Sequence, residues 1–112
     1  MVAKTKYIQE MLNKIDNGAE RVVSPDGNTI IWRGCELIGT NITNVIWVYH
    51  YEVKILTVAY SKGLRYVSKN GRSFVIHNNA YSVTDARIIN QVLDRYVGGY
   101  VAHSRKGEVI ID

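Results

Sequence analysis

Apolar and polar positions follow a helical period at two places in this chain. In residues 5–16 the apolar side chains recur at i, i+1, i+4, i+5 and i+8, which predicts a helix that buries one face. The Asn17-Gly18 pair should end this helix, because Gly tolerates the left-handed conformation found at helix C-termini. The apolar stripe consists of Tyr7, Ile8, Met11, Leu12 and Ile15.

The second helical pattern begins at Ser82 and ends before Gly98-Gly99. The Ser82 hydroxyl can accept a hydrogen bond from the backbone N–H of Asp85, whose carboxylate complements the positive start of a helix. The residues predicted to form the buried stripe are Ala86, Ile89, Val92, Leu93 and Tyr96. The residues expected to face water are Arg87, Asn90, Gln91, Asp94 and Arg95.

The first extended stretches flank a turn sequence. Residues 21–23 and 29–32 lie on either side of Pro-Asp-Gly and predict a β-hairpin, because Pro presets φ and Gly accepts a positive φ. Gly34 then interrupts the pattern. Residues 35–38 are therefore expected to form a short third strand or a continuation past a bulge, followed by a loop at 39–44.

Residues 45–60 are the most strand-like part of the chain and are too long for one ordinary strand. We expect two antiparallel strands, joined by a turn near 51–54. Both strands are apolar on two faces, which predicts a central place in the sheet. One face should lie under the helices, and the other should be covered by a partner or by the chain's own tail.

Two further hairpins are predicted toward the C-terminus. Asn70-Gly71 favours a two-residue type I′ turn, which would pair Lys69 with Arg72 and Val67 with Phe74. Residues 100–103 and 108–111 should form the last hairpin. The chain is therefore predicted to be one α+β domain over residues 1–112, an antiparallel sheet of five to seven strands with an N-terminal and a C-proximal helix.

Composition places this chain among ordinary globular proteins. It is 46% hydrophobic and 21% charged, which excludes a disordered chain. No apolar run is long enough for a membrane span, and the N-terminus has no apolar signal core, so we expect no membrane partner and a cytoplasmic location. The single cysteine, Cys35, is expected to be a small core residue.

Positive charge gathers in one segment. Between Val53 and Thr84 there are five Lys or Arg residues and no Asp or Glu. Basic side chains interleaved with tyrosines suit anionic ligands that carry bases, because Lys and Arg neutralise phosphate while Tyr stacks on a base. A solvated strand face is the structural alternative. The residues predicted to bind such a ligand are Lys62, Arg65, Tyr66, Lys69, Arg72 and Tyr81.

No motif in the sequence indicates catalysis, a metal or a cofactor. His50, His77 and His103 lack metal-ligand spacing and are expected to be sheet histidines with satisfied hydrogen bonds. There is no Gly-x-Ser-x-Gly elbow and no phosphate-binding glycine motif. We therefore expect no enzyme. That expectation would change only if the fold brought His50 or His77 beside a carboxylate in a cleft.

Aromatic residues concentrate in the predicted sheet. The chain has 8 tyrosines, and Trp32, Trp47, Tyr49 and Tyr51 fall in adjacent strands. Exposed aromatics are common anchors of protein interfaces. This sheet could therefore pair two copies of the chain or dock on another protein, with core packing as an equal alternative.

Residues 77–90 resemble a pattern in small uncharacterised bacteriophage and prophage proteins. There a strand ends in a polar-Gly-aromatic turn, and Thr-x-Thr-Thr-x-x-Arg-Ile-Asn opens a helix. Ala80 stands here where Gly is typical, Asp85 where a second Thr is typical, and Ile89 is inserted. The similarity covers about residues 55–96. The matching residues are Tyr81, Ser82, Thr84, Arg87, Ile88 and Asn90.

The resemblance implies a phage accessory protein, a class whose members often act by binding. Some inhibit host defence, including anti-CRISPR proteins, and others sequester nucleotide signals. Together with the basic segment, this leads us to expect a non-enzymatic binding protein that counteracts a host defence system by capturing an anionic, nucleotide-type ligand. The alternatives are a protein-interaction inhibitor of a host nuclease and a nucleic-acid-binding module.

Overall fold

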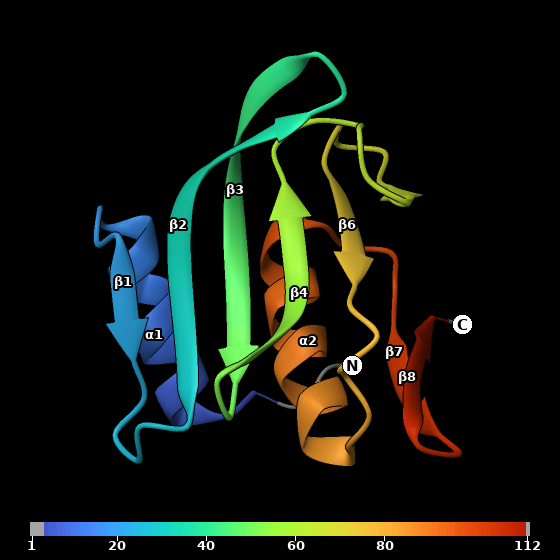
Figure 1. Ribbon diagram of the computed structural model, residues 1–112. Coiled ribbons are helices and arrows are strands. Elements are labelled where there is room, and N and C mark those ends of the chain that lie inside the picture. The colour runs from blue at the N-terminus through green and yellow to red at the C-terminus, as the bar shows by residue number, and fades with distance from the viewer. Residues whose placement is uncertain (1–3, 112) are drawn as a thin grey trace.

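Two helices cover one face of an antiparallel sheet in the computed structural model, which describes residues 4–111 (Figure 1). The helices are α1 (Lys6–Asp16) and α2 (Val83–Tyr96). The six strands stand in the order β1-β2-β3-β4-β6-β5. They are β1 (Arg21–Val23), β2 (Thr29–Ile38), β3 (Asn41–His50), β4 (Val53–Ala59), β5 (Tyr66–Val67) and β6 (Ser73–Ile76). The predicted α+β class, with an N-terminal and a C-proximal helix, is confirmed.

Both helices bury the apolar stripes expected of them, and α2 also buries Asp85, Ile88 and Gln91. α1 buries Ile8, Met11, Leu12 and Ile15, and Tyr7 is half-buried beside them. In α2, Gln91 was expected to face water, and this prediction is wrong, since the side chain is 2% exposed. Its Oε1 accepts hydrogen bonds from the backbone N–H of Thr5 at 2.7 Å and from Nε2 of Gln9 at 3.1 Å. Gln91 therefore joins α2 to the start of α1.

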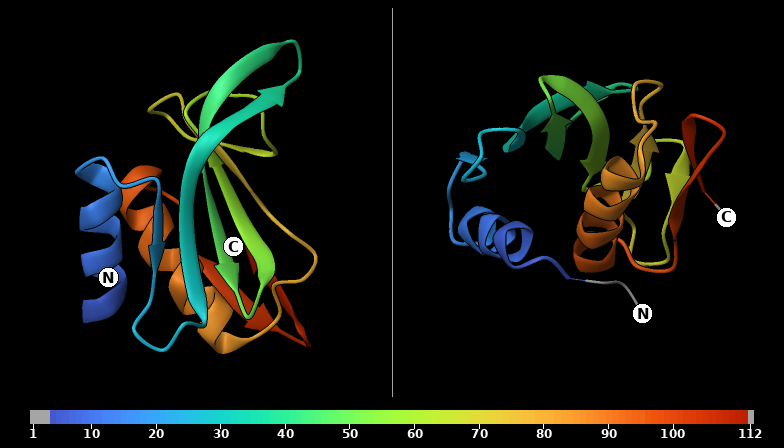
Figure 2. Two further views of the ribbon diagram at one scale, coloured as in Figure 1. Left: turned by 60° about the vertical axis from the view of Figure 1, so that its left-hand side comes forward. Right: turned by 90° about the horizontal axis from the view of Figure 1, so that it is seen from below.

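The β2–β3 hairpin is longer than predicted. β2 runs without interruption to Ile38 and pairs with β3 in continuous register, so residues 41–44 are strand and not loop. Gly34 is needed for packing, because a Cβ there would lie 2.6 Å from the Trp47 ring. The far end of this hairpin extends beyond the rest of the sheet (Figures 1 and 2). At that end the paired residues Leu37 and Ile42 are 66% and 77% exposed.

The turn between β3 and β4 falls where the sequence placed it. Tyr51 and Glu52 form the link, and both have positive φ, at 52° and 66°. Two consecutive residues with positive φ are the mark of a type I′ turn. This turn places His50, the last residue of β3, next to an exposed tyrosine at the end of the sheet.

The β5–β6 hairpin has a register different from the predicted one. Val67 pairs with Ser73 and Tyr66 with Phe74, so the pairing is shifted by one residue. The Ser68 N–H bonds the Arg72 carbonyl, and only Gly71 in the loop has a positive φ. The loop is a type I turn followed by a left-handed glycine, and not the two-residue type I′ turn that Asn70-Gly71 favoured.

The C-terminal hairpin lies beside α2, past the β6 edge of the sheet (Figure 1). β7 (Ala102–Arg105) and β8 (Glu108–Ile111) pair with each other and contact α2. Asn90 fixes them, donating through Nδ2 to the Ala102 carbonyl at 2.9 Å and accepting from the Ala102 N–H at 2.6 Å. The tail therefore does not cover the outer face of the sheet. Among residues 4–111, no helix is long and apolar enough to cross a membrane.

Candidate functional site

The six predicted ligand-binding residues do not form one site. Lys69 and Arg72 belong to the β5–β6 loop, which contacts the C-terminal end of α2. Tyr81 immediately precedes the N-cap of α2, at its other end. A 14-residue helix spans about 21 Å at 1.5 Å per residue, so Tyr81 cannot share a small ligand with the loop.

The β5–β6 loop caps the C-terminus of α2. Arg72 Nη1 donates to the Tyr96 carbonyl at 2.9 Å, and Asn70 Nδ2 donates to the same oxygen at 3.1 Å. Ser68 Oγ donates to the Val97 carbonyl at 2.9 Å. The last carbonyls of a helix lack intrahelical donors and carry partial negative charge, which a cation stabilises. Part of the basic segment therefore has a structural role, and Arg72 carries most of it.

Some of the other predicted residues pack against neighbouring side chains, and some are exposed to solvent. Tyr66 stacks on Phe74 with ring centroids 5.1 Å apart, and the Arg65 guanidinium lies 5.4 Å from the Tyr66 ring centre. Lys62, Arg65 and Lys69 are exposed. Within residues 4–111 none of these three cations forms an ion pair. They are the part of the predicted site that the fold leaves available to an anion.

A groove of about 540 Å³ lies between the β5–β6 loop and the turn that follows α2. Lys69 and Asn70 line one side of it, and Gly98, Gly99 and Tyr100 line the other. Both glycines have positive φ, at 73° and 80°, which lets the chain turn sharply after the helix. The groove is within the size range of pockets that bind small organic molecules.

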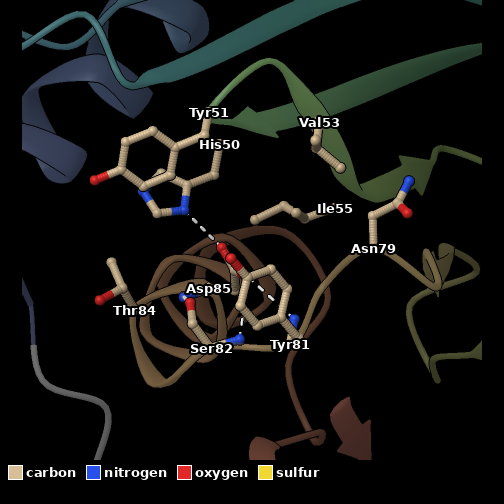
Figure 3. A pocket seen from close by; sticks show the side chains of 9 residues that line it. All are labelled: His50, Tyr51, Val53, Ile55, Asn79, Tyr81, Ser82, Thr84 and Asp85. Carbon is tan, nitrogen blue, oxygen red and sulfur yellow. Dashed lines mark hydrogen bonds and ion pairs between the residues drawn. The ribbon is translucent and has the colours of Figure 1, made fainter. Parts of the chain in front are cut away.

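A second pocket lies at the N-terminal end of α2 and contains a histidine–carboxylate pair (Figure 3). His50 Nδ1 is 2.6 Å from Asp85 Oδ1, and the two side chains are 8% and 5% exposed. The Tyr51 ring lies against the imidazole, with centroids 4.3 Å apart. The fold thus meets the one condition under which the sequence left room for an enzyme.

Asp85 is held as a carboxylate by the start of the helix. Its Oδ2 accepts the backbone N–H groups of Tyr81 at 3.1 Å and Ser82 at 3.2 Å, and Ser82 Oγ accepts the Asp85 N–H at 3.0 Å, as predicted. Burial alone would raise the pKa of Asp85, but the hydrogen bonds from Tyr81, His50 and Ser82 outweigh burial and lower it. An ionised carboxylate accepts a hydrogen bond from the Nδ1–H of His50.

The second ring nitrogen of His50 is free. Within the described chain Nε2 has no hydrogen-bond partner, and no fully buried side-chain nitrogen or oxygen lacks one. Nε2 therefore reaches solvent, and His50 lines the pocket. With Nδ1 donating to Asp85, the neutral imidazole offers a lone pair on Nε2. Chemically, the pair can accept a proton from a bound water or hydroxyl group.

No local pattern in the sequence indicates this pair. His50 and Asp85 are 35 residues apart, on β3 and α2. His77, by contrast, bonds Thr57 Oγ1 at 2.8 Å, as expected of a sheet histidine, and burial followed by the charge of Lys54 lowers its pKa. The prediction for Cys35 is wrong, because the side chain is exposed and its thiol bonds Asn44 Oδ1 at 3.3 Å.

The outer face of the sheet presents aromatic rings together with cations. Trp32 pairs with Trp47 across β2 and β3, and the Trp32 and Tyr49 rings are 6.4 Å apart. Arg21 lies 5.4 Å from the Trp32 ring centre, and Lys54 lies 5.7 Å from that of Trp47. Neither helix packs on this face (Figure 2). The aromatic strands predicted by the sequence are therefore only partly buried.

Among residues 4–111, no group of three or more His, Cys, Asp or Glu side chains could hold a metal ion. Comparison of the chain with protein-family models, with curated proteins and with solved structures finds no match in any of the three.

Proposed function

We propose that this protein captures an anionic, nucleotide-type ligand and counteracts a host defence system by withdrawing that ligand. The observation that supports the proposal is the positive charge of Lys62, Arg65 and Lys69, which are exposed and form no ion pair within residues 4–111. Between Val53 and Thr84 no carboxylate accompanies these cations in the sequence. Exposed cations without partners attract anions over a distance of about 8–10 Å at moderate salt.

The groove beside Lys69 is the proposed site of capture. Its volume of about 540 Å³ suits a mononucleotide or a small cyclic nucleotide better than a long polymer. Lys69 would neutralise a phosphate, and the half-buried Tyr100 ring forms part of the opposite wall. Arg72 and Tyr66 hold the β5–β6 loop in place, because Arg72 bonds the last turn of α2 and Tyr66 stacks on Phe74.

Isothermal titration against a panel of cyclic and linear nucleotides tests the proposal. We expect binding heat with at least one compound and a loss of affinity of tenfold or more in Lys69→Glu. The matched control is Lys6→Glu, which changes the same charge at an exposed position of α1. If no compound gives heat, or if both variants weaken binding equally, the groove is not the site.

An inhibitor that docks on a host nuclease is the second candidate. Exposed apolar side chains favour it: Trp32 on the outer face of the sheet, and Leu37 and Ile42 at the far end of the β2–β3 hairpin. Large exposed apolar side chains are typical interface anchors. In this case Trp32→Ala should abolish retention of a host nuclease in a pull-down while Lys69→Glu should not. The reverse pattern would exclude this candidate.

Nucleic-acid binding is the third candidate. Arg21 and Lys54 lie over tryptophan rings on the outer face, a combination of charge and stacking that suits a single strand. Affinity for single-stranded DNA or RNA should then fall steeply with salt, by roughly one log-log unit per phosphate contacted. A flat salt response would rule this candidate out.

A further inference from the structure

The histidine–carboxylate pocket has no part in the proposed ligand capture. We propose that it is a separate hydrolytic site, in which His50 acts as general base on a small, uncharged carboxylic ester. The pocket lies at the N-terminal end of α2 and the basic groove at its C-terminal end. The two proposals can therefore fail independently.

His50 has the arrangement required of a base. Asp85 fixes the imidazole from the Nδ1 side at 2.6 Å, and the pair is almost fully buried. A buried carboxylate in this position holds the ring in one tautomer and stabilises the imidazolium that forms when Nε2 takes up a proton. Asp85 is accordingly a positioning residue. The titratable groups that line the pocket are His50, Asp85, Tyr51 and Tyr81.

The start of α2 supplies hydrogen-bond donors beside this base. Asp85 uses the N–H groups of Tyr81 and Ser82, whereas the N–H of Thr84, a residue that lines the pocket, has no acceptor within the described chain. Free N–H groups at a helix start carry the positive end of the macrodipole. Such donors stabilise the negative oxygen that develops when a carbonyl carbon is attacked.

The lining of the pocket limits the substrate. No Lys or Arg lines it, and the Asp85 carboxylate lies at its base, so an anionic substrate is disfavoured. Val53, Ile55 and the ring of Tyr81 provide apolar contacts. The volume of about 230 Å³ admits a short acyl group and a small alcohol portion, and not a long chain.

The proposed reaction is a hydrolysis with water as nucleophile. His50 Nε2 removes a proton from water as the water oxygen bonds to the ester carbonyl carbon, and the carbonyl electron pair moves to the carbonyl oxygen, which lies near the start of α2 at Thr84. The tetrahedral intermediate then expels the alcohol oxygen, which takes the proton back from the imidazolium. One ester and one water give one acid and one alcohol, and His50 returns to its neutral form.

Hydrolysis of p-nitrophenyl acetate by the full chain tests the proposal. We expect saturable turnover above the rate given by an equal concentration of free imidazole. His50→Gln should lower the rate by about 10²–10⁴-fold. Asp85→Asn should also lower it and should change the pH profile, since the amide cannot stabilise an imidazolium.

His77→Gln is the matched control, because it removes a histidine that lies outside the pocket and bonds Thr57. It should leave the rate unchanged. The tautomer of His50 in the unmodified protein gives a check that does not depend on the folding of a variant. ¹⁵N NMR at neutral pH should show the proton on Nδ1. Three results would each overturn the proposal. They are a proton on Nε2, a rate that rises linearly with ester concentration and does not exceed that of free imidazole, and equal effects of the two histidine variants.

Discussion

Replacing Arg72 by alanine tests whether this residue supports the fold and not only a ligand. The guanidinium donates to the Tyr96 carbonyl at 2.9 Å, at the negative end of α2. It also lies 4.4 Å from the Tyr60 ring centre, close enough for a cation–π contact. Arg72→Ala removes both interactions and leaves that carbonyl with Asn70 as its remaining side-chain donor.

The expected loss in the free energy of unfolding follows from these contacts. A hydrogen bond from a charged group contributes about 1.5–3 kcal/mol, and a partly exposed site lies toward the lower end. The ring contact adds about 0.5–1 kcal/mol, part of which is shared with the hydrogen bond because one side chain makes both. We therefore expect a net loss of about 1.5–3 kcal/mol for Arg72→Ala.

Urea unfolding, followed by tryptophan fluorescence, measures this change as a lower midpoint with an unchanged slope. Lys69→Ala is the matched control, since Lys69 is an exposed cation of the same loop and forms no ion pair with any described residue. That control should stay within about 0.5 kcal/mol of the unmodified protein. If Arg72→Ala is no less stable than Lys69→Ala, the capping role assigned to Arg72 is wrong.

Three further predictions concern the fold. The pKa of Asp85 is lower in the folded protein than the value of 3.8 expected in the unfolded chain, so the ionised carboxylate stabilises the fold fully above pH 3.8. This stabilisation is lost as the pH falls through the folded-state pKa. In Asp85→Asn, the free energy of unfolding should therefore fall less steeply with pH below 3.8, as measured by acid unfolding. Gly34→Ala should cost about 1–3 kcal/mol in thermal unfolding and change Trp47 emission, because the new Cβ would lie 2.6 Å from that ring; unchanged emission and stability would contradict the packing. Ser82→Ala should destabilise by about 1 kcal/mol through loss of the helix cap, measured by urea unfolding, and an unaffected midpoint would show that the cap contributes little.

The sequence determined the elements of this protein because their signals are local. The apolar spacing of α1, the Ser82 cap of α2 and the turn between β3 and β4 depend on residues within a few positions of one another. For the same reason the α+β class could be predicted. The errors at Gly34 and at Asn70-Gly71 have a common cause. A glycine in the sequence is compatible with a break in a strand, with close packing against an aromatic ring and with several turn types. Only the pairing with the neighbouring strand decides which of these forms.

The tertiary structure decided which side chains meet along α2 and at its two ends. Gln91 is polar yet buried, because the start of α1 supplies the partners that its amide needs. Arg72 was expected to await an anion, but packing places a helix carbonyl within its reach. His50 and Asp85 meet although they are 35 residues apart, because the sheet brings the end of β3 to the start of α2. Contacts of this kind depend on register and on packing between elements, which no local pattern in the chain encodes.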